Sequence, residues 1–255
     1  MRKSTRVRFE NGRGHRLAGI LESPPTPRAF ALFAPCFTCS KDLKAIVRIS
    51  RRLADRGVAV LRFDFTGLGE SEGVFSDTNF QTNRQDILAA ADFLEATFQP
   101  PSLLIGHSLG GAASLATAPA IDSVRAIATI AAPSDTVHLA HLLSHMNPDI
   151  DRVGNGAVII GGLSHRITRQ MLETLRQTDL SQLLRQVQTP LIAFHSPVDA
   201  TLGWEHAERI FQSVQGPRTL VTLDGADHLL VRQPRDVHFV ADLIEVWAQR
   251  YLATH

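Results

Sequence analysis

The feature of this sequence that most constrains its fold is a repeated alternation of short apolar runs with longer segments of helical periodicity. Strand-length apolar runs rich in β-branched and aromatic residues occur at 29–34, 58–63, 103–105, 126–131, 191–194 and 219–223. A run that is apolar throughout is typical of a parallel strand buried on both faces, and helical crossovers connect such strands. Two alternating segments, 5–10 and 15–21, flank Asn11-Gly12 and predict an antiparallel hairpin at one edge. We therefore predict an α/β fold with a mostly parallel, eight-stranded sheet and helices on both faces.

The alternation stops between Ser134 and Thr189. Within this stretch, two apolar segments around Gly161-Gly162 predict a small β-hairpin. The stretch is too long for a plain connection between strands, so we expect residues 134–189 to pack over one end of the sheet as a lid. Residues 1–133 and 190–255 would then form the core.

Composition narrows the classes of function. The formal net charge is +1 over 255 residues, so we expect no nucleic acid and no membrane surface as a partner. No apolar run approaches the ~20 residues of a membrane span. The basic start Met1-Arg2-Lys3 lacks the apolar segment of an export signal. We expect a cytoplasmic protein acting on a small molecule, and the sequence leaves its oligomeric state open.

One motif carries the main chemical prediction. The segment Gly106-His107-Ser108-Leu109-Gly110 matches the pattern G-x-S-x-G, follows an apolar strand, and opens a helix of small residues. A sharp strand-to-helix turn of this kind exposes the serine hydroxyl above the sheet. We predict that Ser108 is a nucleophile, and we interpret His107 as a residue that packs inward.

A serine hydroxyl needs a base to act as a nucleophile at neutral pH. Asp199 follows the apolar run 191–194 and His228 follows the next run, so both reach the carboxyl edge of the sheet with Ser108. The chain order serine, aspartate, histidine is the one expected for this motif. We predict His228 as the base and Asp199 as the acid that orients it, with Asp135 as the alternative acid.

The loop after the run 29–34 carries a second prediction. Stabilising an oxyanion takes backbone N–H donors, and we predict Leu109 and Phe37 for this role. Phe37 lies inside the motif Cys36-Phe37-Thr38-Cys39. A C-x-x-C pair between a strand and a helix is also typical of thiol redox proteins. The two cysteines are therefore candidate modulatory thiols, a redox pair in a rival interpretation, or simple packing residues.

Two further patterns predict no cofactor. The loop Asp64-Phe65-Thr66-Gly67-Leu68-Gly69-Glu70-Ser71 lacks the third glycine of a G-x-G-x-x-G fingerprint, so we interpret it as a support for the site. His138, His141 and His145 would share one helical face, but no cysteine or aspartate partner accompanies them. We therefore expect a polar face there and no metal.

Taken together, these motifs resemble the α/β-hydrolase superfamily over essentially the whole chain. The segments at 36–42, 62–69 and 224–230 resemble the hydrolase domain of bacterial proteins in which it is fused to an OsmC (osmotically inducible protein C) domain. The chain is expected to lack that second domain, and it has Pro35 where a histidine is expected. The resemblance implies the α/β-hydrolase fold and hydrolysis of esters or thioesters with small acyl groups. The alternative from another class is a non-catalytic binding protein with the same fold.

Overall fold

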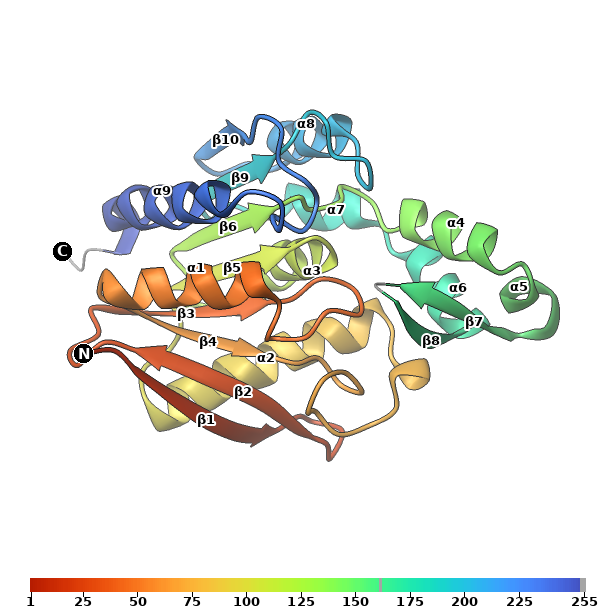
Figure 1. The fold of residues 1–255 in the computed structure, drawn as a ribbon, viewed down its shortest axis with the longest axis horizontal. Helices are drawn as coiled ribbons and strands as arrows, with labels where there is room; N and C mark the ends of the chain where they lie inside the picture. Colours follow the sequence, from red (N-terminus) through yellow and green to blue (C-terminus); the bar gives the residue numbers. More distant parts are fainter. Residues whose placement is uncertain (161, 253–255) are drawn as a thin grey trace.

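A computed structural model describes residues 1–160 and 162–252 (Figure 1). Its main element is an eight-stranded sheet in the order β1-β2-β4-β3-β5-β6-β9-β10. The strands are β1 Lys3–Glu10, β2 Arg16–Ser23, β3 Ala29–Ala34, β4 Val58–Phe63, β5 Leu103–His107, β6 Ala126–Ile130, β9 Leu191–His195 and β10 Arg218–Thr222. All neighbours from β4 to β10 pair in parallel, whereas β2 is antiparallel to both β1 and β4. The predicted sheet and its edge hairpin are confirmed.

Helices cover both faces of the sheet, because the central strands are apolar on both sides. The helices of the core are α1 Lys44–Asp55, α2 Phe80–Thr97, α3 Leu109–Thr117, α7 Leu180–Arg185, α8 Trp204–Ser213 and α9 Pro234–Leu252, with short 3-10 turns η1 Phe75–Asp77 and η2 Ala118–Ala120. Helices α1 and α9 lie side by side on one face, where Leu53 and Ile244 join one apolar cluster. On the other face, α2, α3 and α7 contribute Ile87, Leu115 and Leu184 to a second cluster.

The segment between β6 and β9 contains several elements that project beyond the strand ends (Figure 1). They are α4 Val137–Met146, α5 Asp149–Val153, β7 Asn155–Ile160, β8 Leu163–Thr168 and α6 Arg169–Gln177. Strands β7 and β8 pair in antiparallel register, which confirms the predicted hairpin, although Gly161 of its turn lies outside the described residues. The Thr168 hydroxyl donates a hydrogen bond to the Ser76 carbonyl (3.1 Å), so the hairpin is tied to η1 of the core.

Parallel order places the carboxyl ends of β3, β5, β6, β9 and β10 at one edge of the sheet, beside the projecting segment. The loops that leave these strands therefore converge, although they come from distant parts of the sequence. Within the described part of the chain, every helix is too short or too polar to cross a bilayer.

Candidate active site

Ser108 occupies a strained turn between β5 and α3. Its backbone has φ 51° and ψ −124°, a conformation that costs a non-glycine residue about 1–3 kcal/mol. The turn fits because its flanking glycines lack side chains. A Cβ at Gly106 would lie 2.4 Å from the Gly110 carbonyl oxygen, and a Cβ at Gly110 would lie 2.2 Å from the Pro35 oxygen. The motif thus brings the serine and the loop after β3 into close contact.

The structure brings Ser108, His228 and Asp199 together, although 120 residues separate the first two. The Ser108 hydroxyl lies 3.0 Å from His228 Nε2, and His228 Nδ1 lies 2.7 Å from Asp199 Oδ2. Both distances are those of hydrogen bonds. In this arrangement the ring can accept the serine proton at Nε2, while Nδ1–H donates to the carboxylate.

The surroundings of Asp199 keep it ionised. Burial by itself would raise the pKa of Asp199, but the hydrogen bond and charge of His228, together with two backbone hydrogen bonds, hold the pKa below its ordinary value. The other carboxylate oxygen, Oδ1, accepts hydrogen bonds from the backbone N–H groups of Thr201 (2.8 Å) and Leu202 (3.1 Å). These two bonds fix which oxygen of Asp199 faces the histidine.

The alternative acid, Asp135, faces a different partner. Its Oδ2 lies 3.2 Å from Arg209 Nη1, and its Oδ1 accepts a hydrogen bond from the backbone N–H of His138 (3.0 Å). The nearby ring of His206 uses Nδ1 to accept a hydrogen bond from the backbone N–H of Ser134. Asp135 therefore belongs to a cluster at the start of α4, and Asp199 is the carboxylate that contacts His228.

The two predicted oxyanion donors line one cavity with the serine. Phe37, Leu109, Ser108 and His228 all border it. Leu109 begins α3, where the first backbone N–H groups have no helical acceptor. Neither the Leu109 nor the Phe37 N–H has a hydrogen-bond acceptor among the described residues. Both groups are therefore available to an oxygen atom of a bound molecule.

A buried ion pair between Lys41 and Asp64 holds the loop that carries Phe37. The sequence did not predict this pair. The Lys41 ammonium group lies 2.8 Å from Asp64 Oδ2 and 2.7 Å from Glu70 Oε2, and the Lys41 backbone N–H donates to Asp64 Oδ1 (2.6 Å). The Glu70 N–H donates to Asp64 Oδ2 (2.9 Å). The glycine-containing loop from Asp64 thus wraps around its own carboxylate and supports the loop at 36–41, as the sequence interpretation expected.

Cys36 and Cys39, the candidate modulatory thiols, form a disulfide in this structure, so neither is present as a free thiol. Their Cα atoms lie 5.1 Å apart, within the range that a disulfide can join. A tight turn brings them together, in which the Cys39 N–H donates to the Cys36 carbonyl (3.2 Å). Thr38 inside this turn has φ 62°, an unusual value for a β-branched residue.

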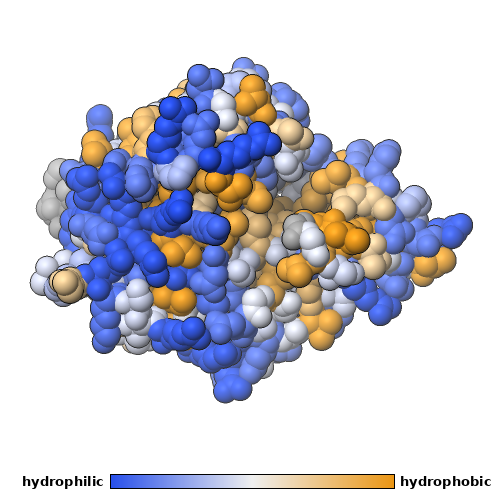
Figure 2. Space-filling view, viewed as in Figure 1, coloured by the Kyte–Doolittle hydropathy of each residue, from blue (hydrophilic) through white to orange (hydrophobic). Residues whose placement is uncertain are grey.

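An apolar groove with a volume of about 660 Å³ leads away from the serine. Ser108 and His228 border it together with the loop at 36–43, and α4 and the hairpin supply its apolar wall: Leu139, Leu142, Leu143, Met146, Ile159, Ile160 and Leu163. Ile159 is 70% exposed and Leu163 65% exposed. Figure 2 shows apolar side chains gathered on this part of the surface. Exposed apolar surface of this kind is typical of a site that binds an apolar ligand or partner.

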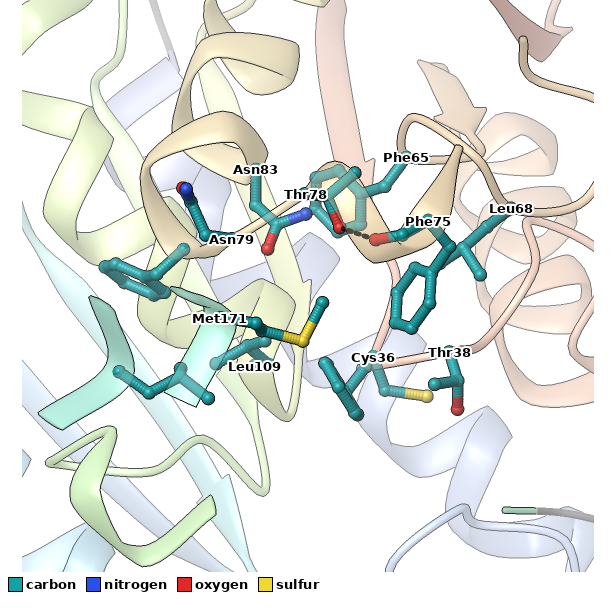
Figure 3. Close-up of a pocket in the computed structure, with 13 residues that line it drawn as sticks. Cys36, Thr38, Phe65, Leu68, Phe75, Thr78, Asn79, Asn83, Leu109 and Met171 are labelled. Atoms are coloured by element: carbon teal, nitrogen blue, oxygen red, sulfur yellow. Dashed lines mark hydrogen bonds between the residues drawn. The ribbon is translucent and has the colours of Figure 1, made fainter. Parts of the chain in front are cut away.

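A second, much smaller cavity, shown in Figure 3, has Phe37 in its lining. Phe65, Phe75 and Met171 line it, and its volume of about 10 Å³ has room for about one water molecule. The Thr78 hydroxyl in its wall donates to the Phe75 carbonyl (2.7 Å). This cavity has room for little more than one water molecule, so of the two it is the groove that can hold a larger molecule.

The predicted polar face of α4 contains His138, whose Nε2 lies 3.3 Å from the Thr201 carbonyl oxygen. His145 contacts the His141 carbonyl oxygen through Nδ1 (3.2 Å). Across residues 1–160 and 162–252, no three histidine, cysteine or acidic side chains are grouped so that they could hold a metal ion.

Comparison with known proteins gives a consistent result. The model of the alpha/beta hydrolase family matches residues 30–238. The crystal structure of an esterase domain from a Rhodothermus marinus protein is 46% identical, has a TM-score of 0.81, and is matched over 98% of this chain and 100% of that chain. A mitochondrial palmitoyl-protein thioesterase, ABHD10 of Rattus norvegicus, is 23% identical over 225 residues, which are 84% of this chain and 73% of the relative. Est1E of Butyrivibrio proteoclasticus, solved with ferulic acid, shares the fold at 19% identity, with a TM-score of 0.79 and coverage of 97% and 100%.

Proposed function

Because the chain belongs to the alpha/beta hydrolase family, we propose that it is a serine hydrolase that cleaves carboxylic esters through an acyl-enzyme on Ser108. The observation that carries the proposal is the 3.0 Å contact between the Ser108 hydroxyl and His228 Nε2. A nucleophile within hydrogen-bond reach of an oriented base is what acyl transfer requires. Asp199 supports the proposal because its contact with His228 Nδ1 leaves Nε2 free of a proton.

In the proposed reaction, Ser108 Oγ attacks the carbonyl carbon of the ester and passes its proton to His228 Nε2. The carbonyl oxygen becomes an oxyanion and accepts hydrogen bonds from the N–H groups of Phe37 and Leu109. The carbon–oxygen bond to the alcohol then breaks, and the alcohol leaves with the proton from His228. A water molecule then attacks the acyl carbon and passes a proton to His228. The bond from that carbon to Ser108 Oγ breaks, the carboxylic acid leaves, and Oγ takes the proton back from His228.

The groove supports an apolar group on the substrate. Asp42 and His228 are the titratable side chains among the described residues that border it, and these include no lysine or arginine that could pair with an anionic substrate. Pockets of about 300–1,000 Å³ hold drug-sized molecules, so the groove of about 660 Å³ exceeds the needs of an acetyl group. The relatives named as an esterase and a thioesterase support an acyl carbonyl as the bond attacked, and thioesters are included in the proposal.

We also propose that the part of residues 134–189 from α4 to α6 acts as a lid over this groove, whereas α7 of the predicted range packs on the core beside α3. Apolar side chains of α4 and of the β7–β8 hairpin form its outer wall, so a change in their position would change access to Ser108. We propose as well that the chain is related to the hydrolase domain of OsmC fusion proteins. A cytoplasmic location is also proposed.

The test is hydrolysis of p-nitrophenyl acetate, butyrate and octanoate, and of matching thioesters, by the wild type and by Ser108→Ala. We expect Ser108→Ala to lower kcat by about four to six orders of magnitude, because the nucleophile is lost. Ser213→Ala, at the end of α8 and outside the groove, is the matched control and should retain the wild-type rate. Equal rates for the wild type and Ser108→Ala would refute the proposal. Labelling by a fluorophosphonate probe that Ser108→Ala abolishes would support it independently.

A further inference from the structure

The residue next to the proposed nucleophile makes a contact that the reaction scheme does not use. His107 ends β5, and its side chain is buried. Its Nε2 lies 2.7 Å from the backbone carbonyl oxygen of His228, and the two imidazole rings are 5.3 Å apart between centroids. The interpretation of His107 as a residue that only packs inward is therefore incomplete.

The contact fixes the protonation of the His107 ring. A carbonyl oxygen can only accept, so Nε2 of His107 must carry a proton and donate it. Burial, followed by the charge of His228, lowers the pKa of His107 to about 4, so the ring is neutral at neutral pH. Nδ1 is then a bare acceptor, and it is buried without a partner among the described residues. His107 thus keeps an unsatisfied atom in the core while it makes one hydrogen bond to the base.

We propose that His107 is a positioning residue that holds His228 at the distance required for proton transfer from Ser108. Adjacent residues contact the two ends of the base: Ser108 contacts its ring and His107 contacts its main-chain carbonyl. The nucleophile and the anchor of the base therefore share one rigid strand-to-helix turn. This inference rests on the proposed function, because it assigns His107 a role only through His228.

The loop of His228, between β10 and α9, packs Ala226 and Leu230 into the apolar core, but the hydrogen bonds of Asp227 stay within the loop. The Asp227 carboxylate accepts hydrogen bonds from the N–H groups of Val231 (3.1 Å) and Arg232 (2.8 Å), and the Asp227 carbonyl accepts one from Leu230 (2.9 Å). These bonds shape the loop but do not join it to β5. The contact from His107 joins the main chain of the loop to the end of β5.

The consequence for catalysis follows from distance. A displacement of about 1 Å between reacting groups can lower the rate about 100-fold, because proton transfer requires hydrogen-bond contact. Loss of the His107 contact would allow the main chain of His228 to move while the groove is unchanged. The effect should therefore fall on kcat and leave KM nearly constant.

Three variants separate this role from simple packing. His107→Leu removes the donor and should lower kcat about 10- to 100-fold. His107→Gln carries an N–H group at a similar distance from the backbone and should restore most of the rate. His107→Asn is equally polar but too short to reach the carbonyl, and it should resemble His107→Leu. The comparison of glutamine with asparagine remains informative if the leucine variant does not fold, which circular dichroism and a thermal unfolding curve would reveal.

The deciding measurement is made in a His228→Ala background. Without the base, there is nothing for His107 to position, so adding His107→Leu should cause no further loss of the residual rate. A residue that maintains the Ser108 turn would lower the residual rate by the same factor in both backgrounds. An equal loss in both backgrounds would overturn the inference. Equal rates for the glutamine and asparagine variants, or a wild-type rate for His107→Leu, would overturn it as well. If Ser108→Ala retains the wild-type rate, the proposed function fails instead.

Discussion

Replacing Lys41 by methionine tests whether the buried ion pair under the oxyanion loop stabilises the protein. The Lys41 side chain is 1% exposed and that of Asp64 is 0% exposed, whereas that of Glu70 is 46% exposed. Lys41→Met has a similar volume but removes the charge, and leaves the Asp64 carboxylate buried with only its backbone N–H partners. Breaking a buried ion pair in this way costs about 3–5 kcal/mol of unfolding free energy.

For a protein of this size, each kcal/mol lowers Tm by about 2–4 °C, so Lys41→Met should lower Tm by roughly 6–20 °C. Thermal unfolding followed by circular dichroism measures the shift. The control is Glu70→Gln, which removes the exposed partner of the same lysine and should leave Tm almost unchanged, because solvent screens that contact. The rate of ester hydrolysis should also fall in Lys41→Met below its Tm, because Phe37 lies on the loop that Lys41 anchors.

The double variant Lys41→Met/Asp64→Asn decides whether the buried charge is the cause. Asparagine retains an acceptor for the Lys41 N–H but carries no charge, so the double variant should be more stable than Lys41→Met alone. If the two substitutions lower the unfolding free energy additively, or if Lys41→Met costs no more than Glu70→Gln, the argument from the buried pair is refuted.

Two more predictions concern the proposed active site. Asp199→Asn should lower kcat by about three to four orders of magnitude. Because Oδ1 accepts two backbone N–H groups, the new amide would turn its NH₂ group toward His228 Nδ1. The proton of the ring would then stay on Nε2, where it blocks transfer from Ser108. Asp135→Asn is the matched control and should keep the wild-type rate. The free energy of unfolding of the wild type should contain the full contribution of Asp199 above about pH 4 and lose it as the pH falls through the lowered pKa. Asp199→Asn should lack this pH dependence. Reduction of the Cys36–Cys39 disulfide should lower kcat by less than the roughly hundredfold expected for a lost oxyanion donor, because the turn bond from Cys39 remains. Dithiothreitol should leave the rate of the Cys36→Ser/Cys39→Ser variant unchanged, and an equal effect on both proteins would contradict a role for the disulfide.

The sequence by itself determined the architecture, because periodicity reports which faces of each segment must be buried. Apolar runs such as 29–34 and 103–105 can be stable only between two layers of helices, and this requirement yields a parallel sheet. The motif around Ser108 was also readable, because the need for glycine at 106 and 110 arises from contacts within a few residues and with the adjoining loop.

Tertiary structure alone decided which distant side chains meet. Asp135 and Asp199 both follow parallel strands and were both reasonable partners for a histidine, and only the contact of Arg209 with Asp135 and of His228 with Asp199 distinguishes them. The contacts of His107 and Lys41 were not predictable for the same reason, whereas the spacing of Cys36 and Cys39 allowed a disulfide without deciding that one forms. A hydrogen bond or a buried ion pair depends on distances of a few ångströms between segments whose spacing along the chain carries no information about their separation in space.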